Sequence, residues 1–200
     1  MSEVTAPAGT HPPESESESE TPSKRGTRQV IEWMVLIAAA LLLALLIKAF
    51  LFQAFYIPSE SMVPTLNKND RVLVNKLSYK FHDVHRGDIV VFEAPPGEED
   101  DIKDLVKRVI GLPGDQIAFK DGVVYVNGSP LDESYLPEGT ITSQTCNVAA
   151  QVTVPANSYW VMGDNRQASK DSRCFGAIPK GDIVGRVFFK MWPPSDLSIM

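Results

Sequence analysis

The pattern of hydrophobic and polar positions divides the chain into three parts. Residues 1–28 are rich in Ser, Glu, Pro and Thr and have almost nothing to bury, which predicts a disordered tail. Residues 29–54 contain an apolar run from Trp33 to Phe52 in which Lys48 is the one charged residue. About twenty helical residues span a hydrocarbon core of roughly 30 Å, so this part predicts a transmembrane helix. Residues 55–200 predict a folded domain.

The apolar run predicts a retained anchor rather than a cleaved leader. Leader cores are shorter, and no triplet of small residues follows the run. Basic residues precede it at Lys24, Arg25 and Arg28. Little positive charge follows beyond Lys48, so the positive-inside rule predicts a cytoplasmic amino terminus and a domain outside the cytoplasm, anchored in the lipid bilayer.

Beyond the anchor, the chain consists of short runs typical of β-strands. These runs are residues 71–75, 88–92, 106–110, 116–120, 123–127, 151–155, 159–163 and 183–190. Asp121-Gly122 lies between two of the runs and predicts a two-residue hairpin, and Asn127-Gly128 predicts a second turn. Because no long amphipathic helix interrupts the runs, the pattern predicts a mainly β, antiparallel domain.

Charge and composition argue against nucleic acid as a partner. The chain has a formal net charge of -6 and a pI near 5.1. Its basic residues cluster only in the short stretch before the apolar run. Nucleic-acid-binding domains generally carry a basic face, so we expect no such binding here.

The cysteines and histidines give no metal-site pattern. Cys146 and Cys174 are the only cysteines and are too far apart for paired zinc ligands. Outside the cytosol they could form a disulfide or remain two thiols, because the sequence does not fix the distance between them. His82 and His85 lie in KFHDVHRGD, which we interpret as a polar loop. We expect no metal and no organic cofactor.

Two serines stand out directly after the anchor, in the segment IPSESMVPTL at residues 57–66. Ser59 and Ser61 lie between Pro58 and Pro64, which restrict the backbone on both sides. A Ser-His-Asp site would need a suitable histidine, and the domain offers only the two in the polar loop. If Ser61 is a nucleophile, another base is required.

Lys107 is the candidate base, because it lies within an apolar β run beside Val106 and Val109. Burial disfavours a charged amine and can lower the pKa of a lysine until it acts as a base near neutral pH. Arg108 alternates to the opposite face of the strand, so only one of the two cations need be buried. The alternative is an ordinary exposed lysine.

A third segment, GDNRQASKDSRCFG at residues 163–176, has two interpretations. It is either a polar surface loop closed by an ion pair between Asp171 and Arg173, or a loop that packs under the site. In the second case one of its hydroxyl groups would hold the lysine amine in place, as a third group orients the base in catalytic triads.

Taken in order, these segments resemble the type I signal peptidases, also called leader peptidases. The matching segments are PSESMVPTL, NDRVLVNKLSY, RGDIVVF, KRVIGLPGD and GDNRQASKDSRCFG, and the resemblance covers roughly residues 30–190. It implies an antiparallel β-sheet catalytic domain like that shared with repressor proteases. It also implies a Ser-Lys serine endopeptidase that removes signal peptides from exported preproteins at the outer face of the cytoplasmic membrane, through an acyl-enzyme and after small residues.

The resemblance also assigns roles. Ser61 would be the nucleophile and Lys107 the general base, while the Ser61 amide and the Ser59 hydroxyl would form the oxyanion hole. The remaining roles fall on Ser169, which would hydrogen-bond the lysine amine, on Asp171 and Arg173 as a supporting ion pair, and on Met62 in the substrate cleft. Departures from the family pattern are Glu60 and Asn69 at frequent glycine positions and Gln167-Ala168 in place of Asp-Asn.

Two alternative hypotheses compete with a signal peptidase. A self-cleaving repressor shares the catalytic core, but it should bring a DNA-binding domain where this chain has an apolar run. A membrane-anchored β domain that only binds exported proteins would not need both Ser61 and Lys107 in matching segments. A specialised family member that processes one dedicated substrate stays an alternative. The sequence does not determine the oligomeric state. Phe188, Phe189 and Trp192 could contact the membrane or belong to the core.

Overall fold

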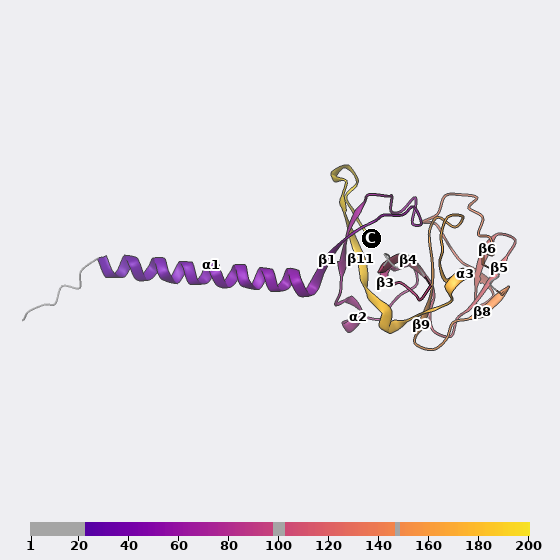
Figure 1. Ribbon diagram of the computed structural model, residues 1–200, viewed down its shortest axis with the longest axis horizontal. Helices are drawn as coiled ribbons and strands as arrows, with labels where there is room; N and C mark the ends of the chain where they lie inside the picture. Colours follow the sequence, from indigo (N-terminus) through magenta and orange to yellow (C-terminus); the bar gives the residue numbers. More distant parts are fainter. Residues whose placement is uncertain (1–22, 98–102, 147–148) are drawn as a thin grey trace, which may run out of the picture. The chain divides into compact units, whose positions relative to one another are not determined.

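The computed structural model describes residues 23–97, 103–146 and 149–200 (Figure 1). Its first element is the helix α1, Ser23–Leu51, which is rich in the strong helix formers Ala and Leu. The predicted tail lies outside the described residues up to residue 22, and residues 23–28 are helical. The stretch Gly26–Leu46, 21 residues of which none is buried in the protein, is long and apolar enough to cross a membrane.

The chain from Leu45 to Met200 forms one compact unit, and after α1 it is mainly antiparallel β, as the alternating pattern predicts. The larger sheet has the strand order β1-β2-β11-β3-β4-β9-β10, and β12 pairs with β11. In that order its strands are Phe52–Tyr56, Arg71–Asn75, Ile183–Trp192, Ile89–Glu93, Asp104–Gly111, Ser158–Met162 and Ile178–Pro179, with β12 at Ser198–Ile199.

A smaller sheet has the order β7-β6-β5-β8. These strands are Ser129–Pro130, Val123–Val126, Gln116–Lys120 and Gln151–Thr153. The predicted hairpin is present between β5 and β6, where Asp121 and Gly122 have φ values of 52° and 80°. Positive φ at both central residues is what a type I′ turn requires, which explains the Asp-Gly pair.

Short helices complete the unit: α2 is Ser78–Phe81, α3 is Ser172–Phe175, and two single 3-10 turns are η1, Lys180–Asp182, and η2, Pro194–Asp196. The sequence pattern missed β1, because Phe52–Tyr56 continues the apolar run of the anchor without a break. Residues 52–54 of the predicted anchor are therefore strand rather than helix.

The core beneath the larger sheet extends into the loop between β1 and β2. Ile57, Met62 and Leu66 of this loop are buried together with strand residues from β2, β3 and β11. Because a fully buried aliphatic side chain contributes about 1.5–3 kcal/mol, these three anchors fix the loop on the sheet. In the middle of β11, Phe188 packs on Phe52 with ring centroids 5.4 Å apart, and Trp192 at the end of the strand is half exposed.

Candidate functional site

The 57–70 loop, which connects β1 to β2, carries both serines of the first candidate segment. It is closed at its base by hydrogen bonds from the Ile57 amide to the Asp70 carbonyl, 2.9 Å, and from the Asn69 amide to the Ile57 carbonyl, 2.8 Å. Asn69 has a φ of 74°, a conformation that Asn tolerates better than most side chains, so the departure from glycine is accommodated. The loop therefore presents Ser61 from a fixed frame.

The structure brings Ser61 and Lys107 together across 46 residues of sequence. Lys107 lies on β4 opposite Val90 of β3, and its Nζ is 2.8 Å from the Ser61 Oγ and 3.1 Å from the Val106 carbonyl oxygen. Both residues are buried, with 8% of Ser61 and 3% of Lys107 exposed. A hydroxyl and an amine at hydrogen-bond distance in a desolvated site form the arrangement that an activated nucleophile needs.

Ser59 lies beside the nucleophile candidate, with its Oγ 3.2 Å from the Ser61 Oγ. Its side chain is exposed, so it borders the site from the solvent side. Met62, which the resemblance placed in the substrate cleft, is only 1% exposed and packs in the core cluster under the loop. Its side chain supports the loop from below, and a direct contact with substrate stays a prediction.

Ser169, in the 163–176 segment, also lies close to Ser61. A Cβ added to Gly163 would stand 2.2 Å from the Ser169 Oγ and 2.4 Å from the Ser61 carbonyl oxygen, so the two serines flank this glycine closely. Only a residue without a side chain fits at Gly163. The Ser169 Oγ is buried and hydrogen-bonds to no atom of the described residues, so its bond to Lys107 stays a prediction.

Asp171 and Arg173 form a buried, two-pronged ion pair rather than a surface contact. The Arg173 Nε and Nη2 each donate to an Asp171 oxygen at 2.8 Å, and neither side chain is exposed. Asp171 also accepts a hydrogen bond from the Gly163 amide at 3.0 Å. The pair thus holds the backbone that lies against Ser61, as the packing part of the second interpretation expects, while a hydroxyl that holds the lysine amine stays a prediction.

The sequence analysis gave no role to Asp164 or Asn165, although both lie in a quoted segment, and it did not predict that Arg108 is buried as well as Lys107. Arg108 points away from Lys107, as alternation predicts, but it is buried, and its Nε and Nη2 donate to Asp164 at 2.9 and 2.6 Å. The Asn165 amide donates to the Ser61 carbonyl at 3.0 Å, and its side chain donates to the Glu60 carbonyl at 3.2 Å. Asn165 thus holds the 57–70 loop at two consecutive residues.

Arg166 ties this region to the segment that connects β7 to β8 of the smaller sheet. It donates to Glu133 at 2.9 Å, to the Thr142 hydroxyl at 2.7 Å and to the Gly163 carbonyl at 3.1 Å. Burial by itself would lower the pKa of Arg166, but the Glu133 carboxylate raises it above its usual value. The guanidinium therefore stays charged and keeps its buried partners in place.

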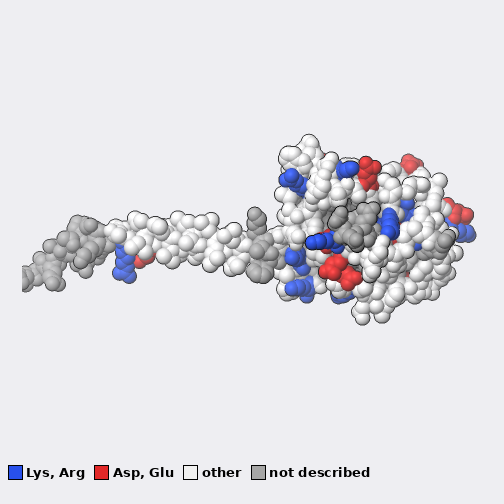
Figure 2. Space-filling model, viewed as in Figure 1, with Lys and Arg blue, Asp and Glu red and all other residues white. Residues whose placement is uncertain are grey.

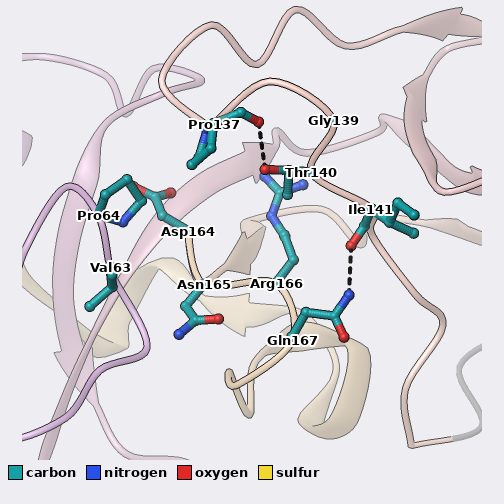
Figure 3. A pocket seen from close by; sticks show the side chains of 10 residues that line it. All are labelled: Val63, Pro64, Pro137, Gly139, Thr140, Ile141, Asp164, Asn165, Arg166 and Gln167. Carbon is teal, nitrogen blue, oxygen red and sulfur yellow. Dashed lines mark hydrogen bonds between the residues drawn. The ribbon is translucent and has the colours of Figure 1, made fainter.

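A pocket of about 450 Å³ opens beside the 57–70 loop (Figure 3). It is lined by Val63, Pro64, Pro137, Gly139, Thr140, Ile141, Asp164, Asn165, Arg166 and Gln167. Figure 3 shows Gln167 donating to the Ile141 carbonyl, 3.3 Å, so this side chain bridges two walls of the pocket. Val63, one of the lining residues, comes two positions after Ser61, so the pocket borders the 57–70 loop.

Cys146 and Cys174 form a disulfide, with Cα atoms 4.8 Å apart, which resolves the two alternatives left open by the sequence. Cys174 follows Arg173 in α3, and Arg173 also donates to the Ser143 carbonyl at 3.0 Å. The bridge thus joins the segment around Ser143 to the buried ion pair.

The histidines stay apart from this site. His82 and His85 are exposed. Over residues 23–97, 103–146 and 149–200, no three His, Cys, Asp or Glu side chains gather as a metal site would require.

Comparison with known proteins gives a consistent picture. The model of the family described as signal peptidase, peptidase S26, matches residues 30–192. Signal peptidase IB of Staphylococcus aureus (strain COL) is 38% identical over 184 residues, which cover 86% of this chain and 94% of that protein. Signal peptidase I of Leptolyngbya laminosa is 39% identical over 198 residues, which cover 92% and 95%. The crystal structure of a signal peptidase I from Enterococcus faecalis V583 is 31% identical, with a TM-score of 0.44, and covers 53% of this chain and 97% of that one.

Proposed function

The chain belongs to the signal peptidase family, peptidase S26, and we propose that Ser61 and Lys107 form the catalytic dyad with which it removes signal peptides from exported preproteins. The observation that carries the proposal is the 2.8 Å separation between the Lys107 Nζ and the Ser61 Oγ inside a buried site.

The reaction is acyl transfer in two steps. The Ser61 Oγ attacks the carbonyl carbon of the scissile bond while the neutral Lys107 amine takes the hydroxyl proton. The tetrahedral intermediate then collapses, and Lys107 returns the proton to the leaving amine, so the mature protein departs and the signal peptide stays esterified to Ser61. A water molecule, deprotonated by Lys107, completes the hydrolysis.

The negative charge of the tetrahedral intermediate needs donors close to Ser61. The Ser61 amide and the Ser59 hydroxyl are the groups we assign to this role, and Ser59 already lies 3.2 Å from the attacking oxygen. Loss of one such donor typically lowers kcat by about 10²–10³-fold. Because the Asn165 side chain donates to the Glu60 carbonyl, which shares a planar peptide unit with the Ser61 amide, that amide is kept in a fixed direction.

The membrane explains why substrate and dyad meet. α1 supplies an anchor, and Ser61 follows its last residue, Leu51, by ten positions. Ten residues reach at most about 35 Å when fully extended, so the dyad stays near the bilayer surface. A signal peptide held in the same bilayer presents its cleavage segment as an extended strand at that depth. The basic residues before the anchor favour a cytoplasmic amino terminus and an active domain on the outer face.

The proposal is tested with the full chain in detergent and a purified preprotein. The wild type should release the mature protein, and mass spectrometry should place the cut after a small residue at the end of the signal peptide. Ser61→Ala should abolish cutting, while Ser134→Ala, which changes an exposed serine outside the candidate site, should not. A wild type that binds the preprotein without cutting it would instead support a binding domain.

A further inference from the structure

A second pocket, of about 360 Å³, lies away from the dyad and has a different character. It is lined by Lys76, Leu77, Tyr79, Lys80, Lys180, Ile183 and Val184. None of these residues belongs to the segments that form the candidate active site. Figure 2 shows Lys and Arg side chains gathered over the part of the domain where Figure 1 labels α2.

The three lysines of this pocket have no anionic partner among the residues that the structure describes. Lys76, Lys80 and Lys180 are exposed, and none of them makes an ion pair within the described part of the chain. Ile183 and Val184, from the start of β11, give the pocket an apolar wall. Three ammonium groups beside an apolar wall favour a ligand with a phosphate next to hydrocarbon.

Lys76 lies directly beside the point where the chain leaves the anchor helix. Its amide donates to the carbonyl of Leu51, the last residue of α1, at 3.0 Å. The apolar run of the anchor ends one residue later, at Phe52. Lys76 is thereby held next to the end of this run, where the chain passes from the hydrocarbon core to the headgroup layer.

We propose that Lys76, Lys80 and Lys180 bind the headgroup phosphate of an anionic phospholipid in the leaflet that surrounds the anchor. The inference rests on the membrane anchoring given under the proposed function, but not on the dyad. Such a contact adds a second attachment to the membrane beside α1. It fixes the rotation of the domain about its anchor and hence the direction from which a signal peptide reaches Ser61.

Native mass spectrometry of the full chain in detergent tests this site directly, with phosphatidylglycerol or phosphatidylcholine as the probe. Each basic residue near a lipid surface contributes about fivefold in affinity. The Lys76→Gln/Lys80→Gln/Lys180→Gln variant is therefore expected to bind phosphatidylglycerol at least about tenfold more weakly than the wild type. The matched variant Lys68→Gln/Lys103→Gln/Lys120→Gln removes three exposed lysines elsewhere and should bind as the wild type does.

Three outcomes would overturn the proposal: equal binding of the two lipids by the wild type, equal losses in the two triple variants, or displacement of phosphatidylglycerol by inorganic phosphate at low millimolar concentration. The last result would identify a site for free phosphate instead. Cleavage of a preprotein in detergent, measured on the same samples, keeps the two proposals separate. An inactive protein that binds the lipid selectively would contradict the dyad and leave the lipid site standing.

Discussion

Asp171 and Arg173 form a fully buried ion pair that also holds the backbone on which the site is built. Asp171 accepts a hydrogen bond from the Gly163 amide. Gly163 in turn lies closely between the Ser61 carbonyl and the Ser169 hydroxyl. A buried pair is costly to break, because the remaining charge has no water to solvate it. This pair therefore couples the stability of the domain to the geometry around the nucleophile.

Arg173→Ala should destabilise the domain by about 3–5 kcal/mol, because it leaves Asp171 buried without its cation. Urea unfolding of the full chain in detergent, followed by tryptophan fluorescence, measures the change. Arg71→Ala is the matched control, since Arg71 is exposed on β2 and should change stability by less than about 0.5 kcal/mol. Equal stability of the two variants would show that the buried pair contributes nothing.

Ser169→Ala tests whether this hydroxyl positions the Lys107 amine during the reaction. A hydrogen bond to a charged group is worth about 1.5–3 kcal/mol, so kcat/KM should fall by roughly 10- to 100-fold with little loss of stability. If the hydroxyl binds the Lys107 amine during the reaction, the acid side of the pH–rate profile should also move. Wild-type rates and an unchanged profile would mean that the Ser169 hydroxyl only fills space.

Asp115 gives a prediction for stability at low pH. Burial by itself would raise the pKa of Asp115, but hydrogen bonds from the Leu112 amide, Asn127 and Arg86 lower it below its usual value. A lowered pKa in the folded state stabilises the fold above about pH 4, and this contribution is lost as pH falls through the folded-state pKa. The urea concentration at the unfolding midpoint of the wild type should therefore fall on acidification. The midpoint of the Asp115→Asn variant should fall less. A parallel decline in both proteins would count against the assignment.

The disulfide should stabilise the domain by about 3–4 kcal/mol, as expected for a bridge between cysteines 28 residues apart. Dithiothreitol should lower the unfolding midpoint of the wild type. It should have no effect on the Cys146→Ser/Cys174→Ser variant, which should already unfold at the lower midpoint. A wild type insensitive to reductant under conditions that expose both thiols to alkylation would contradict the prediction.

The sequence predicts the strands well because alternation is a local signal. The runs at residues 116–120 and 123–127 and the Asp121-Gly122 turn reappear as the hairpin of β5 and β6. The strand order is not local, since β11 inserts between β2 and β3 from more than ninety residues away. The sequence pattern did not predict strand β1 for a different reason: its apolar residues continue those of the anchor without a break.

The candidate site could be predicted only where a segment had a recognisable pattern. Ser61 and Lys107 stood out in their own segments, and the fold brings them together. Arg108 and Asp164 pair across 56 residues, a separation over which periodicity carries no information. The hydrogen bond from Asn165 to Ser61 joins two backbone groups. Every residue has these groups, so the amino-acid sequence does not indicate which of them pair.

The central claim is that Lys107 is the base for Ser61, and the pH dependence of kcat/KM for a signal-peptide substrate tests it most directly. The wild-type rate should fall about tenfold for each pH unit below the titration of the Lys107 amine. Lys107→Ala, shown to be folded by its unfolding curve, should be slower by about 10²–10⁴-fold and should lose this dependence. A Lys107→Ala enzyme with the wild-type rate and the wild-type pH profile would contradict the account.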